Sequence, residues 1–522
     1  METRRPVANG VEASRRVQFA VERAIQGANL GAIPGGAPRQ PRMRLHAVRR
    51  LACWLFPLTW FLYFSRDVLG VHFAPDDMMN VGNFYWTPGL WRLFYSQFPI
   101  WRGYYRPMGG LFYLPILSVW GLNPAPYHVA LSLVLAVNVW LVYRLARLLG
   151  AGEWAAGLAA LVACYHAGLG NLYYNTAFVY DALCGCFFLA ALVYCCGIRG
   201  RGRLLSAGQK AMFAVLVVCA LNSKEMALTL PAVVVAYEWI YHPPASWRLR
   251  TVATWLRGGG SAALIAACLA LLDLYGKIFG HDALTGMEGY RPVFTWQRYL
   301  AYQKTFLGDA AFWHAGGAGV LAFWAVVSYL AWRPGARPVL RFCWAWLVFT
   351  PLPIEFLPGK SQACLYIPML GLAVFAAVIF ADLVGALAGA LAGEPLFRHL
   401  FRNRARPVLA AGLIAAGLFY WGRENRRCQQ LLVKPVMAAL GAQTWQVIQQ
   451  FRALNPHVRP HSHVVFLNDP FTEWDMLFIA DLWFRDRSVT VHLQRLTPLP
   501  PSALASVDAV FDYRDGRLLR IR

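Results

Sequence analysis

The chain has 522 residues, of which 58% are hydrophobic and 14% are charged, with a formal net charge of +23. A soluble protein of this length could not bury so much apolar surface, so the composition nearly excludes a soluble fold. We expect a polytopic α-helical membrane protein, whose cytoplasmic loops collect Lys and Arg. That bias explains most of the charge, and no nucleic-acid partner is inferred.

The first segment, residues 1–46, is rich in Arg, Gly and Pro and has no apolar periodicity, which is typical of a disordered basic cytoplasmic tail. A transmembrane region is predicted over 47–425. The block 108–122 is short and contains Pro115, which favours a re-entrant or interfacial segment of a long first external loop. About eleven spans are expected, near 50–66, 125–146, 154–172, 176–197, 208–223, 226–242, 254–276, 314–332, 339–356, 364–388 and 407–422.

The distribution of charge orients these spans. The connections after the even-numbered spans hold 16 basic residues against two acidic ones, Glu153 and Glu394. This asymmetry predicts a cytoplasmic N-terminus, and it places 67–124, 277–313 and everything after 422 on the non-cytoplasmic side. The expected location is a bacterial inner membrane or an ER-type membrane.

The last 90 or so residues differ in character, and we predict a small non-cytoplasmic α/β domain over 430–522. A strand-like run begins at His463, and an amphipathic stretch lies near 474–483. The run 509–521 reads as a hairpin closed by Asp515-Gly516.

Two adjacent carboxylates, Asp76 and Asp77, follow Pro75 in the first external loop. The functional interpretation makes one a general base for an acceptor hydroxyl, while the other orients it, binds a cation or holds a phosphate-bound metal. The alternative is a helix N-cap or a solvated turn. Both aspartates are candidate catalytic residues, and both are candidate ligands of Mg²⁺ or Mn²⁺, although a full oxygen-ligand cage is lacking.

Charged residues suited to substrate binding lie on the same side. Arg106 precedes a proline, where a guanidinium can bind a phosphate or pair with Asp76 or Asp77. Asp181, near the start of the fourth span, should face a cavity rather than lipid. Capping or pairing inside the helix bundle explains Asp181 equally well.

Two turns between apolar blocks supply further cations. Lys224 and Glu225 lie in one of them, and as chain neighbours they should have different partners. Lys224 could neutralise a lipid phosphate, or it could simply snorkel to the interface. Lys360 opens the tenth span, with Glu355 as a candidate partner.

His166 is predicted to be a hydrogen-bonded packing residue, since no metal-ligand spacing accompanies it. Ten of the eleven cysteines fall within or at the end of apolar blocks, and we interpret them as packing residues. The chain has no P-loop, no Rossmann glycine pattern and no G-x-S-x-G motif.

The order of several motifs resembles a known family. They are Asp76-Asp77, Tyr105-Arg106-Pro107, Gly121–His128, Ser223–Pro231 and Leu365–Gly371, which includes Tyr366. Together they resemble the GT-C class of polytopic glycosyltransferases. Within it they are most similar to the protein O-mannosyltransferase-like branch, which includes the transmembrane, tetratricopeptide-containing mannosyltransferases, although the tetratricopeptide repeats are absent here.

The resemblance covers about residues 50–390. It implies transfer of a sugar from a polyprenyl-phosphate donor to an acceptor on the non-cytoplasmic face. It also implies an acidic base in the first external loop, which by motif position is Asp76 or Asp77. Arg106, Asp181, Lys224, Glu225, Lys360 and Tyr366 are then the candidate substrate-binding residues.

The expected function is therefore that of a membrane glycosyltransferase, embedded in the lipid bilayer, that inverts the anomeric centre by direct displacement. The chemistry needs a base, positive charge at the leaving phosphate and an apolar cavity, and the sequence offers all three. The acceptor stays open as a protein, a lipid or a polysaccharide. The alternatives are a transporter or flippase of a lipid-linked glycan, or a non-catalytic assembly protein.

Overall fold

The computed structural model describes residues 40–86, 90–95, 106–279, 288–360, 362–394, 405–472 and 474–522. The chain divides into two units, 1–51 and 52–522, and the contacts below lie within the second. Of the predicted disordered tail, residues 1–39 lie outside the described residues. Helix α2 (Gln40–Ser65) begins directly after them.

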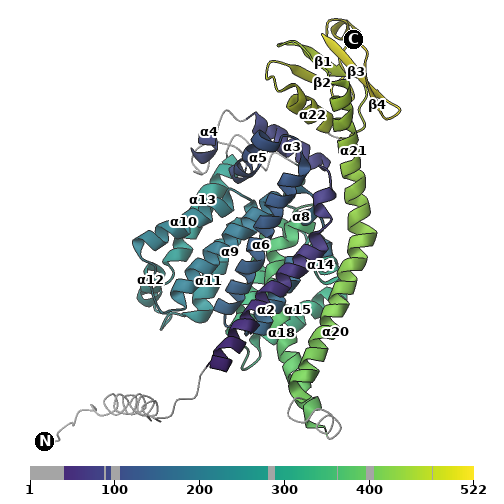
Figure 1. Ribbon diagram of the computed structural model, residues 1–522. Helices are drawn as coiled ribbons and strands as arrows, with labels where there is room; N and C mark the ends of the chain where they lie inside the picture. The colour runs from purple at the N-terminus through teal and green to yellow at the C-terminus, as the bar shows by residue number, and fades with distance from the viewer. Residues whose placement is uncertain are drawn as a thin grey trace, which may run out of the picture. The chain divides into compact units, whose positions relative to one another are not determined.

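Helices dominate the described part of the chain (Figure 1). Three helices of the first external segment and its exit begin at a proline, whose missing N–H costs nothing in a first helical turn. After η1 (Val68–Gly70), the elements in order are α3 (Pro75–Tyr85), α4 (Leu90–Tyr95), α5 (Pro107–Trp120) and α6 (Pro124–Leu148). At 14 residues, α5 is too short to cross a bilayer.

The predicted span 154–172 is wrong in its second half. Helix α7 (Glu153–Cys164) ends early, and three short helical turns lead to α9: η2 (Ala167–Leu169), α8 (Asn171–Tyr174) and η3 (Thr176–Phe178). Close packing explains the break. A Cβ atom at Gly168 would lie 1.9 Å from the carbonyl oxygen of Asp309, and one at Gly170 would lie 2.7 Å from the Val433 side chain.

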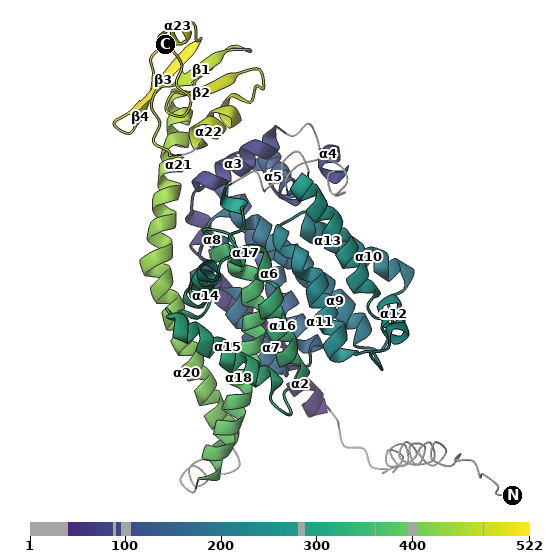
Figure 2. The ribbon, with the colours of Figure 1, turned by 180° about the vertical axis from the view of Figure 1, so that it is seen from behind.

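The remaining helices of the bundle follow in chain order, and Figure 2 shows the side formed by α14 to α18. They are α9 (Val179–Arg199), α10 (Ala207–Leu221), η4 (Glu225–Thr229), α11 (Leu230–Tyr241), α12 (Leu249–Arg257), α13 (Ser261–Phe279), η6 (Glu288–Tyr290), α14 (Trp296–Ala311), α15 (Gly317–Trp332), α16 (Pro338–Phe349), α17 (Leu352–Glu355), η7 (Gln362–Leu365) and α18 (Tyr366–Gly393). The core lies among α6, α7, α9 and α18, which pack against one another.

Among the described residues, five helical segments are long and apolar enough to span a membrane: 124–148, 176–199, 261–279, 362–393 and 405–454. Helices α5, α7, α10 and α15 are apolar but shorter. The protein therefore has the helices of a polytopic membrane protein, while the count of eleven spans stays a prediction.

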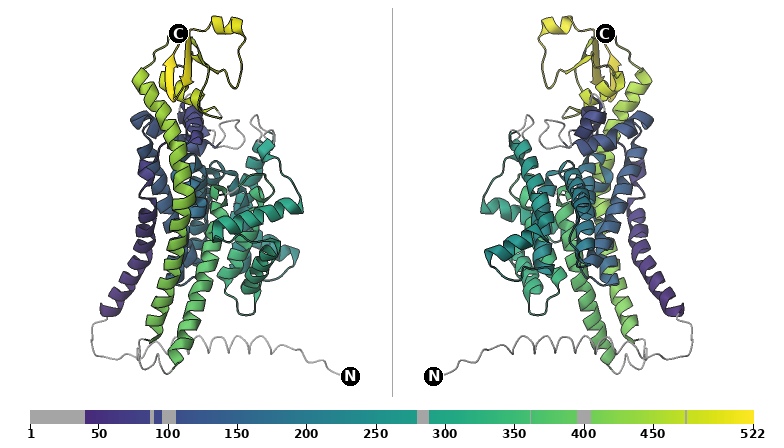
Figure 3. Two further views of the ribbon diagram at one scale, coloured as in Figure 1. Left: turned by 90° about the vertical axis from the view of Figure 1, so that its right-hand side faces the viewer. Right: turned by 90° about the vertical axis from the view of Figure 1, so that its left-hand side faces the viewer.

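One continuous helical rod crosses the predicted domain boundary at 425–430. It consists of α20 (Ala405–Cys428), the π-helical turn η9 (Gln429–Val433) and α21 (Lys434–Leu454), which run together in both views of Figure 3. The amide of Gln429 donates hydrogen bonds to the carbonyl oxygen of Phe64 (2.7 Å) and to the hydroxyl oxygen of Tyr174 (2.6 Å). The π turn places Gln429 against these groups, so the helix bulges there rather than ending.

The chain ends in a four-stranded sheet of order β2-β1-β3-β4. Strands β1 (His463–Phe466), β2 (Thr490–Leu493) and β3 (Ala509–Arg514) are parallel, while β4 (Arg517–Arg520) is antiparallel to β3. The connecting helices are α22 (Asp475–Phe484) and α23 (Pro501–Ala505). The turn between β3 and β4 is Asp515-Gly516, both at positive φ, as predicted for this hairpin.

Candidate active site

The first turn of α3 places Asp76 and Asp77 in opposite surroundings. Asp77 is fully buried, and its carboxylate accepts hydrogen bonds from the Ala74 backbone N–H (2.8 Å) and the Thr176 hydroxyl (2.5 Å). Burial raises the pKa of Asp77 to about 7. Asp76 is exposed. Asp77 therefore fits the alternative interpretation, in which it caps the first turn of a helix. Asp76 remains the candidate general base.

The two aspartates do not fit a shared cation site. Mg²⁺ and Mn²⁺ require several oxygen ligands, and both oxygens of Asp77 already bind groups of the protein interior. Nowhere in the described ranges do three His, Cys, Asp or Glu side chains come together as metal ligands. The geometry therefore offers one exposed carboxylate at this position rather than a pair.

Asn80 connects α3 to α9. Its amide donates to the Asp76 carbonyl oxygen (2.7 Å), and its Oδ1 accepts from the Tyr180 hydroxyl (2.6 Å). The guanidinium carbon of Arg106 lies 5.3 Å from the centre of the Tyr180 ring. Only a glycine fits beside this ring at 109, because a Cβ atom of Gly109 would lie 2.2 Å from it. A continuous line of contacts thus joins the backbone of Asp76 to Arg106.

Arg106 binds Glu225 through two guanidinium nitrogens. Nε lies 3.3 Å and Nη2 2.7 Å from the two carboxylate oxygens of Glu225. Arg106 has φ of 53°, a backbone conformation that is rare and costly for a non-glycine residue and that occurs often at functional sites. The Lys277 ammonium lies 3.9 Å from Glu225 and 2.8 Å from Asp273.

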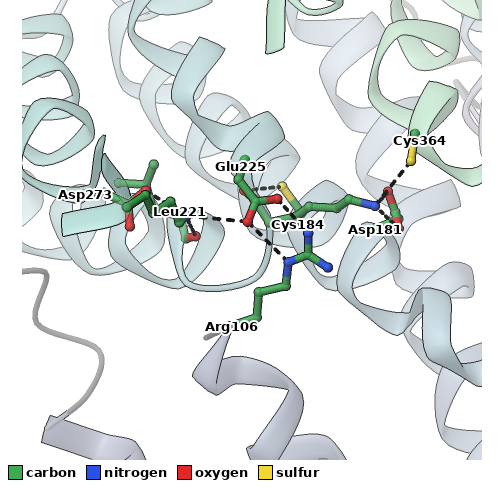
Figure 4. Close-up of polar contacts among 9 residues, drawn as sticks. Arg106, Asp181, Cys184, Leu221, Glu225, Asp273 and Cys364 are labelled. Carbon is green, nitrogen blue, oxygen red and sulfur yellow. Dashed lines mark hydrogen bonds and ion pairs between the residues drawn. The ribbon is translucent and has the colours of Figure 1, made fainter. Parts of the chain in front are cut away.

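A second pair lies beside the first. Lys224 Nζ is 2.6 Å and 2.5 Å from the two carboxylate oxygens of Asp181, in the first turn of α9, and 3.6 Å from the Cys364 sulfur. Figure 4 shows Asp181 and Cys364 on one side of Glu225 and Asp273 on the other. The prediction that the neighbours Lys224 and Glu225 have different partners is confirmed.

We call these six residues the ion-pair cluster; they are three cations and three carboxylates, each side chain between 4% and 16% exposed: Arg106, Asp181, Lys224, Glu225, Asp273 and Lys277. Burial opposes both charged forms, but the partners outweigh it. Asp181 raises the pKa of Lys224 above its usual range, and Arg106 with Lys277 lowers that of Glu225 below its usual range. The carboxylates hold the three cations in fixed positions.

Two predicted substrate-binding residues lie outside the ion-pair cluster. The Lys360 ammonium is 4.0 Å from the centre of the Tyr290 ring, and within the described ranges it makes no ion pair with Glu355. Tyr366 is buried at the start of α18 against Gly185, one helical turn along α9 from Asp181. Of the motif 105–107, Tyr105 lies outside the described residues.

His166 is a packing residue, as predicted. Its Nε2 lies 3.0 Å from the Ala310 carbonyl oxygen, and its Nδ1 accepts from the Gly168 N–H. The ring stacks on Phe312 at 4.5 Å and meets Trp421 edge-on. Both ring nitrogens are satisfied by the backbone, so nothing in these contacts calls for a ligand.

Asp273 and Lys277 were missed by the sequence reasoning. They stand four residues apart near the end of an apolar helix, a spacing that pairs opposite charges on one helical face. Ionisable residues in such a segment require partners, so the sequence could have predicted the pairing of Asp273 with Lys277. The contact of Lys277 with Glu225 could not be predicted in this way, because it depends on how α13 packs against η4.

Comparison with known proteins gives structural likeness only. No family model matches the chain, and none of the curated proteins matches it. Among solved structures it is similar to ArnT from Cupriavidus metallidurans in the apo state, with a TM-score of 0.48 and 14% identity over 91% of this chain and 97% of that chain.

The chain is also similar to the oligosaccharyltransferase of Archaeoglobus fulgidus. The apo form has a TM-score of 0.48 and 11% identity, covering 85% of this chain and 64% of that one. The form tethered with an acceptor peptide has a TM-score of 0.46 and 11% identity, covering 84% and 63%. The chain thus spans just under two thirds of the archaeal protein. At such low identities and scores, the function has to be inferred from the residues of the site.

Proposed function

We propose that the protein is a membrane glycosyltransferase that moves a sugar from a polyprenyl-phosphate donor to an acceptor on the non-cytoplasmic face. The observation that carries this proposal is the ion-pair cluster beside α3. It gathers Arg106, Lys224 and Lys277 in one cluster, and a line of contacts joins that cluster to the backbone carbonyl of Asp76, whose side chain is exposed.

In the proposed reaction, an acceptor hydroxyl attacks the anomeric carbon of the sugar. Asp76 takes the hydroxyl proton, the new bond from the acceptor oxygen to the anomeric carbon forms, and the bond from that carbon to the phosphate oxygen breaks. The polyprenyl phosphate leaves with the bonding electron pair. Direct displacement inverts the anomeric centre.

The cations of the cluster stabilise the negative charge that develops on the leaving phosphate. Asp181, Glu225 and Asp273 fix these cations before the donor binds, so little reorganisation is needed during the reaction. The role of the carboxylates is therefore to position the cations. Asp77 holds the first turn of α3, and with it the backbone that carries Asp76.

The test is transfer of a labelled sugar in proteoliposomes from mannosyl, glucosyl and arabinosyl polyprenyl-phosphate donors. We expect Asp76→Asn to lose 100-fold or more in turnover, roughly the contribution of a general base, with folding intact. Asp382→Asn is the matched control, because this exposed carboxylate pairs with Arg337 away from the cluster. Asp77→Asn should keep most turnover.

Several outcomes would contradict the proposal. Full activity of Asp76→Asn would remove Asp76 as the base. A donor anomeric configuration retained in the product would exclude direct displacement. If wild type transfers no sugar while a lipid-linked glycan changes leaflet in the same vesicles, the protein is a transporter.

A further inference from the structure

The C-terminal part of the chain contacts α3 and the residues next to it at three places. Near the middle of α3, Gly82 lies against Phe478 of α22, and a Cβ atom at 82 would be only 2.7 Å from the Phe478 ring. The glycine is therefore required for the observed approach of the two helices. Because Gly82 has only a hydrogen atom as its side chain, it leaves room for the Phe478 ring, which lies 396 positions further along the chain.

The segment before α3 is held by α21. The His72 ring stacks on the Trp445 ring with centroids 4.3 Å apart and planes at 1°. Next to it, a Cβ atom at Gly441 would lie 2.9 Å from the His72 carbonyl oxygen, so α21 approaches the backbone itself. This contact lies four residues before Asp76.

The end of α3 is held by residues in and after α22. The Arg487 guanidinium carbon lies 5.5 Å from the centre of the Trp86 ring, and its Nη2 donates to the Tyr85 carbonyl oxygen at 3.3 Å. The Trp86 indole N–H donates a hydrogen bond to the Asp481 carboxylate. We call Gly441, Trp445, Phe478, Asp481 and Arg487 the α3 clamp.

The clamp and the bundle hold opposite sides of α3. Toward the bundle, Asp77 binds Thr176 and Asn80 binds Tyr180. Toward the C-terminal part, Gly82 meets Phe478. Asp76, whose carboxylate is exposed, lies in the chain between the His72 and Gly82 contacts. The position of this carboxylate therefore depends on the contacts with the α3 clamp as well as on those with the bundle.

We infer that the C-terminal sheet and its helices, residues 434–522, are a positioning element for the catalytic carboxylate, with Phe478 and Trp445 as positioning residues that act through α3. This inference rests on the proposed function, because it assigns the base to Asp76. Displacement of a reacting group by about 1 Å is enough to cost on the order of 100-fold in rate. Loss of a clamp contact therefore lowers turnover without loss of the donor site.

The decisive experiment is a size swap at the Gly82–Phe478 contact. Gly82→Ala inserts a methyl group against the ring, Phe478→Ala removes the ring, and the double variant restores the space. Gly70→Ala is the matched control, because nothing lies within 4 Å of a Cβ atom there and it stands in the same external segment. The readouts are kcat, KM for donor and acceptor, and the unfolding midpoint of each variant.

We expect Gly82→Ala and Phe478→Ala each to lower kcat at least tenfold with the donor KM within twofold of wild type. The double variant should lose less than the product of the two single losses, because both changes act on one contact. Phe478→Leu, which inserts no atom, serves if Gly82→Ala does not fold, and it should lower kcat in the same way. Gly70→Ala should match wild type.

The possible failures are distinct. Lower midpoints with an unchanged kcat per folded molecule would show a merely structural contact and overturn the positioning role alone. A raised donor KM with unchanged kcat would also overturn it. Absence of transfer by the wild type and by Gly70→Ala would overturn the proposed function, and the positioning role with it.

Discussion

Replacing Asp77 by asparagine should change how the stability of the protein depends on pH. Asp77 is fully buried, and its pKa rises from 3.8 to about 7, mainly through burial. Between these pH values the folded protein keeps Asp77 protonated while the unfolded chain ionises it. The contribution of Asp77 to stability is therefore greatest below pH 4 and falls as the pH rises toward 7.

The size of this effect follows from the pKa change. Each tenfold change in proton affinity is worth about 1.4 kcal/mol, so the rise to about 7 corresponds to about 4 kcal/mol lost between pH 4 and pH 7. Asparagine is neutral throughout and keeps an acceptor for the Ala74 N–H. The unfolding midpoint of Asp77→Asn, relative to that of wild type, should therefore rise by about 5 °C between pH 4 and pH 7 in a protein of this size.

The assay is thermal unfolding in detergent from pH 4.5 to 8, followed by tryptophan fluorescence. The relevant quantity is the difference between wild type and Asp77→Asn at each pH. Burial also raises the pKa of Asp481, to about 6, and this contribution cancels in the difference. Asp77→Ala provides the second arm, because it leaves the Ala74 N–H and the Thr176 hydroxyl without an acceptor, at about 1–3 kcal/mol each.

Two results would refute this reasoning. Parallel pH curves for wild type and Asp77→Asn would show that the carboxyl does not titrate as a buried group. An Asp77→Ala variant as stable as wild type would show that its two hydrogen bonds do not hold the first turn of α3.

Two further predictions concern packing and charge inside the bundle. Replacing Lys224 by Met should lower stability by about 3–5 kcal/mol, because it leaves the Asp181 carboxylate buried and unpaired, and the double variant Lys224→Met/Asp181→Leu should recover much of the loss in thermal unfolding. If the double variant is no more stable than Lys224→Met, Lys224 and Asp181 are not directly coupled. Gly371→Ala should cost about 1–3 kcal/mol, because its Cβ atom would lie 2.2 Å from the Trp346 ring, whereas Gly385→Ala on the same helix meets nothing within 4 Å and should not destabilise. Equal unfolding midpoints for the two alanine variants would contradict this packing.

The helices of the bundle were predictable because their signal is local. Apolar blocks of spanning length, and prolines where helices begin, act on residues that are near in the chain. The hairpin at Asp515-Gly516 was predictable for the same reason, since the turn requires positive φ at adjacent residues. The early end of α7 was not predictable from the sequence. It depends on the close approach of α14 to Gly168 and of η9 to Gly170, and both elements come much later in the sequence.

The composition and charge pattern of the sequence alone determined the membrane class, the predicted sidedness and the loop that carries Asp76 and Asp77. Only the tertiary structure decided which aspartate is exposed, because the burial of Asp77 depends on Thr176, which lies 99 residues away. Only the tertiary structure paired Arg106 with Glu225 and brought Lys277 to them, since these residues come from three separate segments of the chain. Pairing of buried charges is a property of packed elements, and no pattern within one segment contains it.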